Sequence, residues 1–344
     1  MNDLFNQIMI YIQRGEYQEA IRILEKINDI DKIIEICKQI ISIQPSAENF
    51  CIIAYFYDRK SQYEQALVYY NKALEIDPLL DTAYYNRGLI KLFNFHNYKE
   101  AQEDFLKAIK LNPKEPKYWY GLGCVFEMMG YYKKALNAFQ QAIKLKENFA
   151  AALIEIGYIK GKLKNYNEAI IYYEKAMKYE KEFKQKSSIW LELGYFYYEI
   201  EHYYQAISAF KQACLLNPSD PYCWYWLGNA LYMIQQYKKA LEAYNRVIQI
   251  KEDFAEAHLM IAYIKKYLGV YDESIVYYQN AMKFKEDFKK DPSIWYELGC
   301  VYYELKCYDK AIKAFKQALL FAPNDPMILY NLDLVYEQLK SDLK

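Results

Sequence analysis

The sequence predicts an all-α protein, an α-solenoid of repeated antiparallel helix pairs, and three observations support this prediction. The 344 residues include only 11 Gly and 9 Pro, well below the usual shares of about 7% and 5%, so the chain has few residues for the tight turns between short strands. The motif Y-x-x-A recurs at a nearly constant spacing. Within each spacing, apolar residues recur at i, i+3, i+4 and i+7, which is the period of an amphipathic helix.

The Y-x-x-A motif defines a repeating unit. From Tyr63 to Tyr308, the motif tyrosines are separated by 35, 34, 34, 37, 34, 34 and 37 residues. A second motif, W-x-x-L-G or a variant of it, precedes most of them, as at 119–123 and 295–299. A period of this length indicates that each unit is a helical hairpin, which buries its apolar face against the neighbouring units.

A longer repeat contains three of these units. Residues 116–220 and 221–325 align without a gap at an offset of 105, and 53 of the 105 positions are identical. Insertions of three residues, near 185–187 and 290–292, fall at equivalent places in the two copies. The chain therefore contains a duplicated block.

Together these motifs resemble the pattern of the tetratricopeptide repeat family, W-x-x-L-G-x-x-Y…Y-x-x-A-x-x-x-F-x-x-A…P. The resemblance is strong over 47–325, as eight repeats that start near 47, 81, 116, 150, 187, 221, 255 and 292. It implies a right-handed superhelix of antiparallel helix-turn-helix repeats, with a concave groove lined by the first helix of each repeat.

The two ends of the chain depart from the pattern. We interpret 1–46 as a degenerate repeat plus an extra helix over 30–44 that has no clear partner. We interpret 326–344 as a C-terminal capping helix, because a solenoid needs a polar element to end its continuous core.

Some repeats also depart from the family pattern internally. Glu147, Lys181, Glu252 and Glu286 stand where the pattern has proline, and we expect them to lengthen the second helices of their repeats. His258 stands in place of the tryptophan, which predicts a core or groove-edge histidine.

Composition argues against several classes of function. The 44 basic and 44 acidic side chains cancel, whereas nucleic-acid binding needs clustered, uncompensated Lys and Arg. The N-terminal segment lacks the basic region and cleavage site of a signal peptide. The longest uncharged run is too short to span a bilayer. We therefore expect a cytoplasmic protein with no nucleic-acid partner and no membrane insertion.

No catalytic or metal-binding constellation is recognisable. The seven Cys and three His are scattered and have none of the spacings of zinc sites. The sequence has neither a phosphate-binding G-x-x-x-x-G-K-[ST] loop nor a G-x-S-x-G nucleophile motif. The sequence predicts a non-catalytic protein without cofactor or metal.

The resemblance places the binding residues on the first helix of each repeat, beside the W-x-x-L-G positions. An alternative for a part of them is simple packing between neighbouring first helices. The candidate peptide-binding residues are Tyr85, Tyr120, Tyr158, Glu192, Tyr195, Tyr225, Trp226, Tyr232, Tyr263, Tyr267, Tyr296, Glu297, Tyr303 and Glu304.

One groove type of the family can be compared position by position. Its chaperone-binding members clamp a C-terminal carboxylate with Lys, Arg and Asn side chains. Here only Asn86 and Lys117 match, whereas Cys51, Tyr55 and Gly121 occupy other clamp positions. We therefore expect no such clamp.

The leading hypothesis is a protein–protein interaction scaffold whose groove binds a peptide or helical segment of a partner. Tyrosine is typical of recognition surfaces, and the excess of Glu over Lys and Arg in the groove favours a partner with apolar anchors and basic residues. One alternative is a regulatory or targeting subunit of an enzyme that acts in trans. Another is RNA binding, which would require a basic groove.

Overall fold

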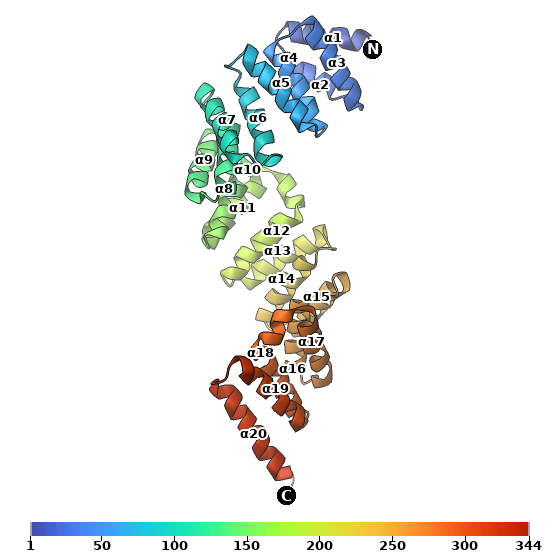
Figure 1. Ribbon diagram of the computed structural model, residues 1–344, viewed down its shortest axis with the longest axis vertical. Helices are drawn as coiled ribbons and strands as arrows, with labels where there is room; N and C mark the ends of the chain where they lie inside the picture. Colours follow the sequence, from blue (N-terminus) through green and yellow to red (C-terminus); the bar gives the residue numbers. More distant parts are fainter. Residues whose placement is uncertain (1, 343–344) are drawn as a thin grey trace. The chain divides into compact units, whose positions relative to one another are not determined.

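The computed structural model describes residues 2–342, and every regular element in this range is helical (Figure 1). The chain divides into two compact units, Met1–Tyr179 and Glu180–Lys344. Consecutive helices form hairpins inside each unit, so the predicted all-α class and the architecture of adjacent helix pairs are confirmed.

The first unit contains eleven α-helices within its described residues. They are α1 (Asn2–Gln13), α2 (Tyr17–Leu24), α3 (Ile30–Ile43), α4 (Ala47–Arg59), α5 (Tyr63–Ile76), α6 (Asp81–Phe93), α7 (Tyr98–Leu111), α8 (Pro116–Met128), α9 (Tyr132–Leu145), α10 (Ala150–Lys162) and α11 (Tyr166–Tyr179).

The second unit contains nine α-helices and two short 3-10 helices within its described residues. They are η1 (Lys181–Gln185), α12 (Ser187–Glu199), α13 (Tyr203–Leu216), α14 (Pro221–Met233), α15 (Tyr237–Ile250), α16 (Ala255–Tyr267), α17 (Tyr271–Phe284), η2 (Glu286–Lys290), α18 (Pro292–Glu304), α19 (Tyr308–Phe321) and α20 (Pro326–Asp342).

The pairing of helices follows the sequence repeat. From α4 to α19, each even-numbered first helix packs most extensively against the second helix that follows it. Second helices also pack against the next first helix within a unit, as α13 does against α14 and α19 against α20. The helices at the start of each predicted repeat therefore form one face of a unit, the first-helix face, and their partners form the second-helix face.

Glycine in the W-x-x-L-G motif permits the close approach of the paired helices. A Cβ atom added at Gly123 would lie 2.5 Å from the ring of Phe139, and one added at Gly228 would lie 2.6 Å from the ring of Tyr244. Both rings are fully buried. The aromatic residue of the second helix thus occupies the space that the glycine leaves free.

The expected lengthening of four second helices is wrong. All second helices from α5 to α19 have 14 residues, and the backbone becomes extended at Lys146 and Lys251 without a proline. An aromatic residue holds the connection instead. Phe149 packs against Tyr120 on the first helix of its own repeat, and the buried Phe254 packs in the same way against Tyr225. The three-residue insertions contribute to η1 and η2 rather than to the preceding helices.

The extra N-terminal helix has a partner, so that expectation is also wrong. Helix α3 has the 14-residue length of a second helix and packs against α4. Ile33, Cys37 and Ile40 are buried in the same core cluster as Ile53. Helix α2 has only eight residues, and this short element is what obscures the register in the sequence.

The tight packing of the pairs leads to a stability prediction. Ala206 of α13 is fully buried, so replacing it with leucine would overpack the helix pair and cost about 1–3 kcal/mol. Urea denaturation measures this loss. Tyr204→Leu is the matched control, because Tyr204 is 72% exposed on the same helix. Equal midpoints for Ala206→Leu and the wild type would contradict the packing register.

Candidate functional site

The described residues offer no support for a metal centre or a membrane span. They contain no group of three or more His, Cys, Asp or Glu side chains that could hold a metal ion. No helix between residues 2 and 342 is both long and apolar enough to cross a membrane.

His258 has a structural role in its repeat. In the repeats with the family tryptophan, the indole N–H donates to a backbone carbonyl six residues earlier, as from Trp119 to Pro113 and from Trp224 to Pro218, both at 3.0 Å. The Nε2 atom of His258 lies 2.8 Å from the carbonyl oxygen of Glu252, also six residues earlier. His258 is 4% exposed, so it replaces the tryptophan as a core hydrogen-bond donor, in agreement with its predicted core position.

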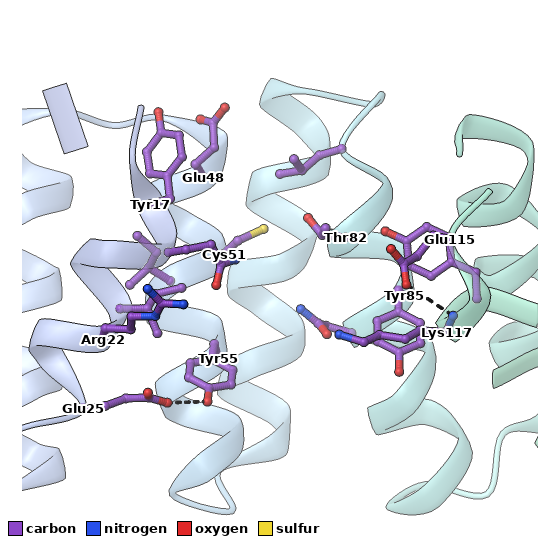
Figure 2. A pocket seen from close by; sticks show the side chains of 16 residues that line it. Tyr17, Arg22, Glu25, Glu48, Cys51, Tyr55, Thr82, Tyr85, Glu115 and Lys117 are labelled. Atoms are coloured by element: carbon purple, nitrogen blue, oxygen red, sulfur yellow. Dashed lines mark hydrogen bonds between the residues drawn. The ribbon is translucent and has the colours of Figure 1, made fainter. Parts of the chain in front are cut away.

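The first-helix face of the first unit contains a cavity of about 580 Å³. Figure 2 shows it between residues of α2 and α4 on one side and residues of α6 and α8 on the other. We call it the N-terminal groove pocket. Its lining residues are Tyr17, Gln18, Ile21, Arg22, Glu25, Glu48, Cys51, Ile52, Tyr55, Leu80, Thr82, Tyr85, Asn86, Glu115, Lys117 and Tyr118.

Aromatic rings supply much of the wall of this pocket. The ring of Tyr85 packs 5.2 Å from that of Tyr118 and 5.9 Å from that of Phe105, and burial raises the pKa of Tyr85 to about 12. Burial likewise raises the pKa of the Cys51 thiol to about 12. The thiol is therefore protonated at neutral pH, which disfavours a role as nucleophile. The pocket offers apolar contact and neutral hydrogen-bonding groups.

Its charged residues differ in how far they are already paired. Glu25 accepts a hydrogen bond from the Tyr55 hydroxyl at 2.8 Å (Figure 2). It accepts another from Arg59 at 2.9 Å. Glu48 forms no ion pair with a described residue. Burial, and after it the charge of Glu48, raises the pKa of Tyr17. Lys117 likewise forms no ion pair within residues 2–342. Glu115 forms no ion pair with a described residue either, and accepts only the backbone N–H of Lys117 at 3.4 Å. Two carboxylates and one ammonium group thus remain available to a ligand.

Of the fourteen candidate residues, only Tyr85 lines this pocket. Tyr120 packs against Phe139 and Phe149, with its hydroxyl 3.4 Å from Glu155. Lys162 lies over the ring of Tyr158 at 5.1 Å.

In the second unit, the candidates gather in clusters of rings. Trp226 lies 5.1 Å from Tyr195, 5.5 Å from Tyr198 and 5.7 Å from Tyr225. Glu192 lies on the same helix as Tyr195 and already interacts with another residue of the chain. These rings pack on one another, as the packing alternative anticipates.

A second ring cluster lies nearby along the sequence. Tyr237 lies 5.6 Å from Tyr232 and 4.7 Å from Tyr267, and Tyr267 remains 69% exposed. Tyr263 packs edge-on against Tyr278 at 5.6 Å. Tyr267 is therefore the most accessible ring of this group.

The last four candidates belong to α18. Glu297 forms an ion pair with Lys266, Glu304 is exposed, and Tyr303 packs 6.0 Å from Tyr308. The hydroxyl of the remaining candidate, Tyr296, accepts a hydrogen bond from Asn331 at 3.2 Å.

Sequence reasoning missed most of the N-terminal groove pocket. Tyr17 and Arg22 come from the short helix α2, whose register was ambiguous, and Thr82 and Glu115 lie at helix starts. A signal was present in the comparison with the family clamp, because Asn86 and Cys51 at clamp positions both line this pocket.

A pair of carboxyl groups lies on neighbouring first helices of the first unit. Burial, followed by the charge of Glu155 on α10, raises the pKa of Glu127 on α8 from 4.5 to about 7. The folded chain therefore binds this proton more tightly than the unfolded chain. Its contribution to stability is present below pH 4.5 and is lost as the pH rises towards about 7.

Replacing Glu127 by glutamine removes this dependence. We expect Glu127→Gln to raise the melting temperature at pH 8, where wild-type Glu127 is charged, and to leave it nearly unchanged at pH 4.5. Thermal melts at both pH values test this, with the exposed Glu103→Gln as control. Equal gains at both pH values would contradict the proton-linked effect.

Comparison with known proteins identifies the repeats. Family models described as tetratricopeptide or TPR repeats match residues 57–92, 81–115, 116–149, 228–269, 255–288 and 292–325. A model described as "Anaphase-promoting complex, cyclosome, subunit 3" matches residues 162–247.

Two curated relatives and one solved structure are similar to this chain. Anaphase-promoting complex subunit 3 of Schizosaccharomyces pombe is 29% identical over 123 residues, which are 36% of this chain and 18% of that protein. A TPR repeat-containing protein of Methanocaldococcus jannaschii is 26% identical over 225 residues, 62% of this chain and 36% of the relative. The structure of Pseudomonas aeruginosa PilF superimposes on 60% of this chain, and the match includes 92% of the PilF chain, at 21% sequence identity and a TM-score of 0.50.

The chain thus spans about a fifth of the length of the S. pombe relative and about a third of the length of the M. jannaschii relative. PilF has the same fold as the matched part of this chain. The matches at 81–115, 116–149, 255–288 and 292–325 each span one helix pair, and matches of this kind occur in both units. The chain belongs to the tetratricopeptide repeat family.

Proposed function

We propose that this chain is a non-catalytic protein–protein interaction scaffold that binds a peptide or helical segment of a partner protein in the N-terminal groove pocket. The observation that carries the proposal is the pocket itself, a cavity of about 580 Å³ lined by α2 and by the first helices α4, α6 and α8. Its mixture of aromatic walls and a few polar groups is typical of ligand sites. Within the first unit, the candidates Tyr120 and Tyr158 would extend this surface along α8 and α10. The candidates of the second unit would form a binding surface of their own.

The charges of the pocket suggest the chemistry of the partner. Glu25 is already bonded to Tyr55 and Arg59, so Glu48 is the carboxylate better placed to attract a basic residue. In the second unit, Glu304 is exposed, whereas the charge of Glu297 is compensated by Lys266. A partner segment with apolar anchors for the tyrosines and one or more basic residues fits this arrangement.

The pocket can be blocked without disturbing the core. Thr82 is exposed and lines the pocket, so Thr82→Trp would fill it from the rim. The partner is first recovered by affinity purification with the wild-type chain and then titrated calorimetrically. We expect Thr82→Trp to cost at least about 2 kcal/mol of binding free energy, as loss of a hot spot does, and Glu48→Lys to weaken binding of a basic segment.

The control places the same bulky residue on the opposite side of a helix pair. Val68 of the second helix α5 is 46% exposed, and Val68→Trp should bind like the wild type. If Thr82→Trp and Glu48→Lys also bind like the wild type, the pocket is not the docking site.

A second candidate function is a regulatory or targeting subunit of an enzyme that acts in trans. It is favoured by the similarity of residues 162–247 to the family model of an anaphase-promoting complex subunit. Under this hypothesis an enzymatic activity should co-elute with the tagged chain in size-exclusion chromatography. Recovery of partners without any such activity would favour the simple scaffold.

A further inference from the structure

Two cavities, each lined by a first helix and the second helix that follows it, occupy equivalent positions in the duplicated block. One, of about 480 Å³, lies over α8 and α9 in the first unit, and the other, of about 490 Å³, lies over α14 and α15 in the second. We call them the α8–α9 pocket and the α14–α15 pocket. Every residue that lines the first has its counterpart 105 positions later in the lining of the second; these residues are Trp119, Leu122, Phe126, Lys134, Asn137, Ala138, Gln140 and Gln141.

The floor of the α14–α15 pocket is apolar. It consists of Trp224, Leu227, Leu231 and Ala243. The indole N–H of Trp224 already donates to the carbonyl oxygen of Pro218 at 3.0 Å, so the ring presents carbon surface to the cavity. Such a floor suits one aliphatic or aromatic side chain of a partner.

The rim of the same pocket is positively charged. Lys211, Lys239 and Arg246 are exposed and are opposed by a single carboxylate, Glu242. Lys239 donates to Gln236 and Arg246 donates to Gln249, both at 3.0 Å. Among the residues that the structure describes, none of these three cations forms an ion pair. Their charge is therefore available to an external anion.

The α8–α9 pocket lacks this excess of charge. Leu106 stands where α13 has Lys211, and Gln141 stands where α15 has Arg246. Its remaining cation, Lys134, lies over the rings of Phe126 and Tyr131 at 5.5 and 5.2 Å. The two copies share their shape and their aromatic floor but differ in charge.

We propose that the α14–α15 pocket binds an acidic segment of a partner protein, with one apolar side chain over Trp224 and carboxylates at Lys211 and Arg246. The site shares no residue with the N-terminal groove pocket, so it does not depend on the function proposed above. A peptide fits better than a nucleic acid, because three cations around a single open pocket do not form the extended basic track that a phosphate backbone requires.

The duplicated block provides a matched exchange of residues. Lys211→Leu/Arg246→Gln replaces two cations of the second pocket by the residues that stand 105 positions earlier, and Leu106→Lys/Gln141→Arg makes the reverse change. All four positions are exposed, so both variants should melt like the wild type. The probe is the fluorescein-labelled peptide Asp-Glu-Asp-Leu-Trp-Glu-Asp-Glu, measured by fluorescence anisotropy with the full chain at low salt.

We expect saturable binding to the wild type and a loss of about tenfold or more in affinity for Lys211→Leu/Arg246→Gln, because close charge pairs across an interface contribute strongly. The reverse variant should bind two peptides per chain. A peptide with Lys in place of the acids should not bind, and one with Gly in place of Leu and Trp should bind more weakly.

Four results would overturn the proposal. The first two are that the wild type shows no saturable binding of the acidic peptide, or that the Lys211→Leu/Arg246→Gln variant binds it with unchanged affinity. The third is that the peptide without Leu and Trp binds as tightly as the original peptide. The fourth is that an oligothymidylate binds more tightly than the acidic peptide at the same positions. The last result would assign the pocket to nucleic acid instead.

Discussion

Replacing Asp104 by alanine is expected to destabilise the first unit by about 3–5 kcal/mol, the usual effect of breaking a buried ion pair. Only 5% of the Asp104 side chain is exposed. Its carboxylate accepts two hydrogen bonds from the Arg87 guanidinium, at 2.5 and 3.0 Å. It also forms an ion pair with Lys91 at 2.9 Å. Without the carboxylate, two largely buried cations would lie side by side in the helix pair. Urea denaturation of the purified chain measures the loss.

The adjacent repeat supplies the control. It has Leu122, Phe126 and Ala138 where α6 and α7 have Arg87, Lys91 and Asp104. The triple variant Arg87→Leu/Lys91→Phe/Asp104→Ala should therefore recover most of the lost stability, because a well-packed apolar cluster can replace a buried ion network without cost. If Asp104→Ala alone unfolds like the wild type, the network contributes little.

Deletion of residues 326–344 should have the other large effect. Ile328, Leu332 and Val335 of α20 are buried against α19, and burial of each such side chain contributes about 1.5–3 kcal/mol. The deletion would expose Phe315, so we expect a lower melting temperature, less monomer and more aggregate.

Gel filtration and thermal melts of the truncated chain test this capping role. A chain that lacks only residues 343 and 344 is the control and should behave like the wild type. An unchanged elution profile and melting curve for the longer deletion would show that α20 is dispensable to the core.

The repeat pattern predicted the helix pairs because helical periodicity is a local property of the sequence. The Y-x-x-A motif marks the start of each second helix from Tyr63 onward, and the structure begins each of these helices at that tyrosine. The length of a second helix was harder to predict, since Phe149 and Phe254 hold the connection where proline is absent. Here the tertiary contact of an aromatic ring replaces a local backbone constraint.

The candidate site was less predictable than the fold. The N-terminal groove pocket depends on Tyr17 and Arg22 of α2 meeting Tyr85 and Lys117 of α6 and α8. Such a meeting depends on how a short, atypical helix packs, which no repeat motif describes. The selected tyrosines of the second unit follow the motif closely, but the motif does not distinguish a ring that awaits a ligand from one that packs against Trp226.

The duplicated block of 105 residues also has a consequence for how such a chain changes over generations. Both copies begin with proline at the first turn of a first helix and end just before the next such helix. Unequal recombination at this junction would add or remove three whole repeats and join surfaces that are already complementary. Each added block would bring another α14–α15-type pocket, which could then diverge in charge while the original is retained, as the difference between Gln141 and Arg246 illustrates.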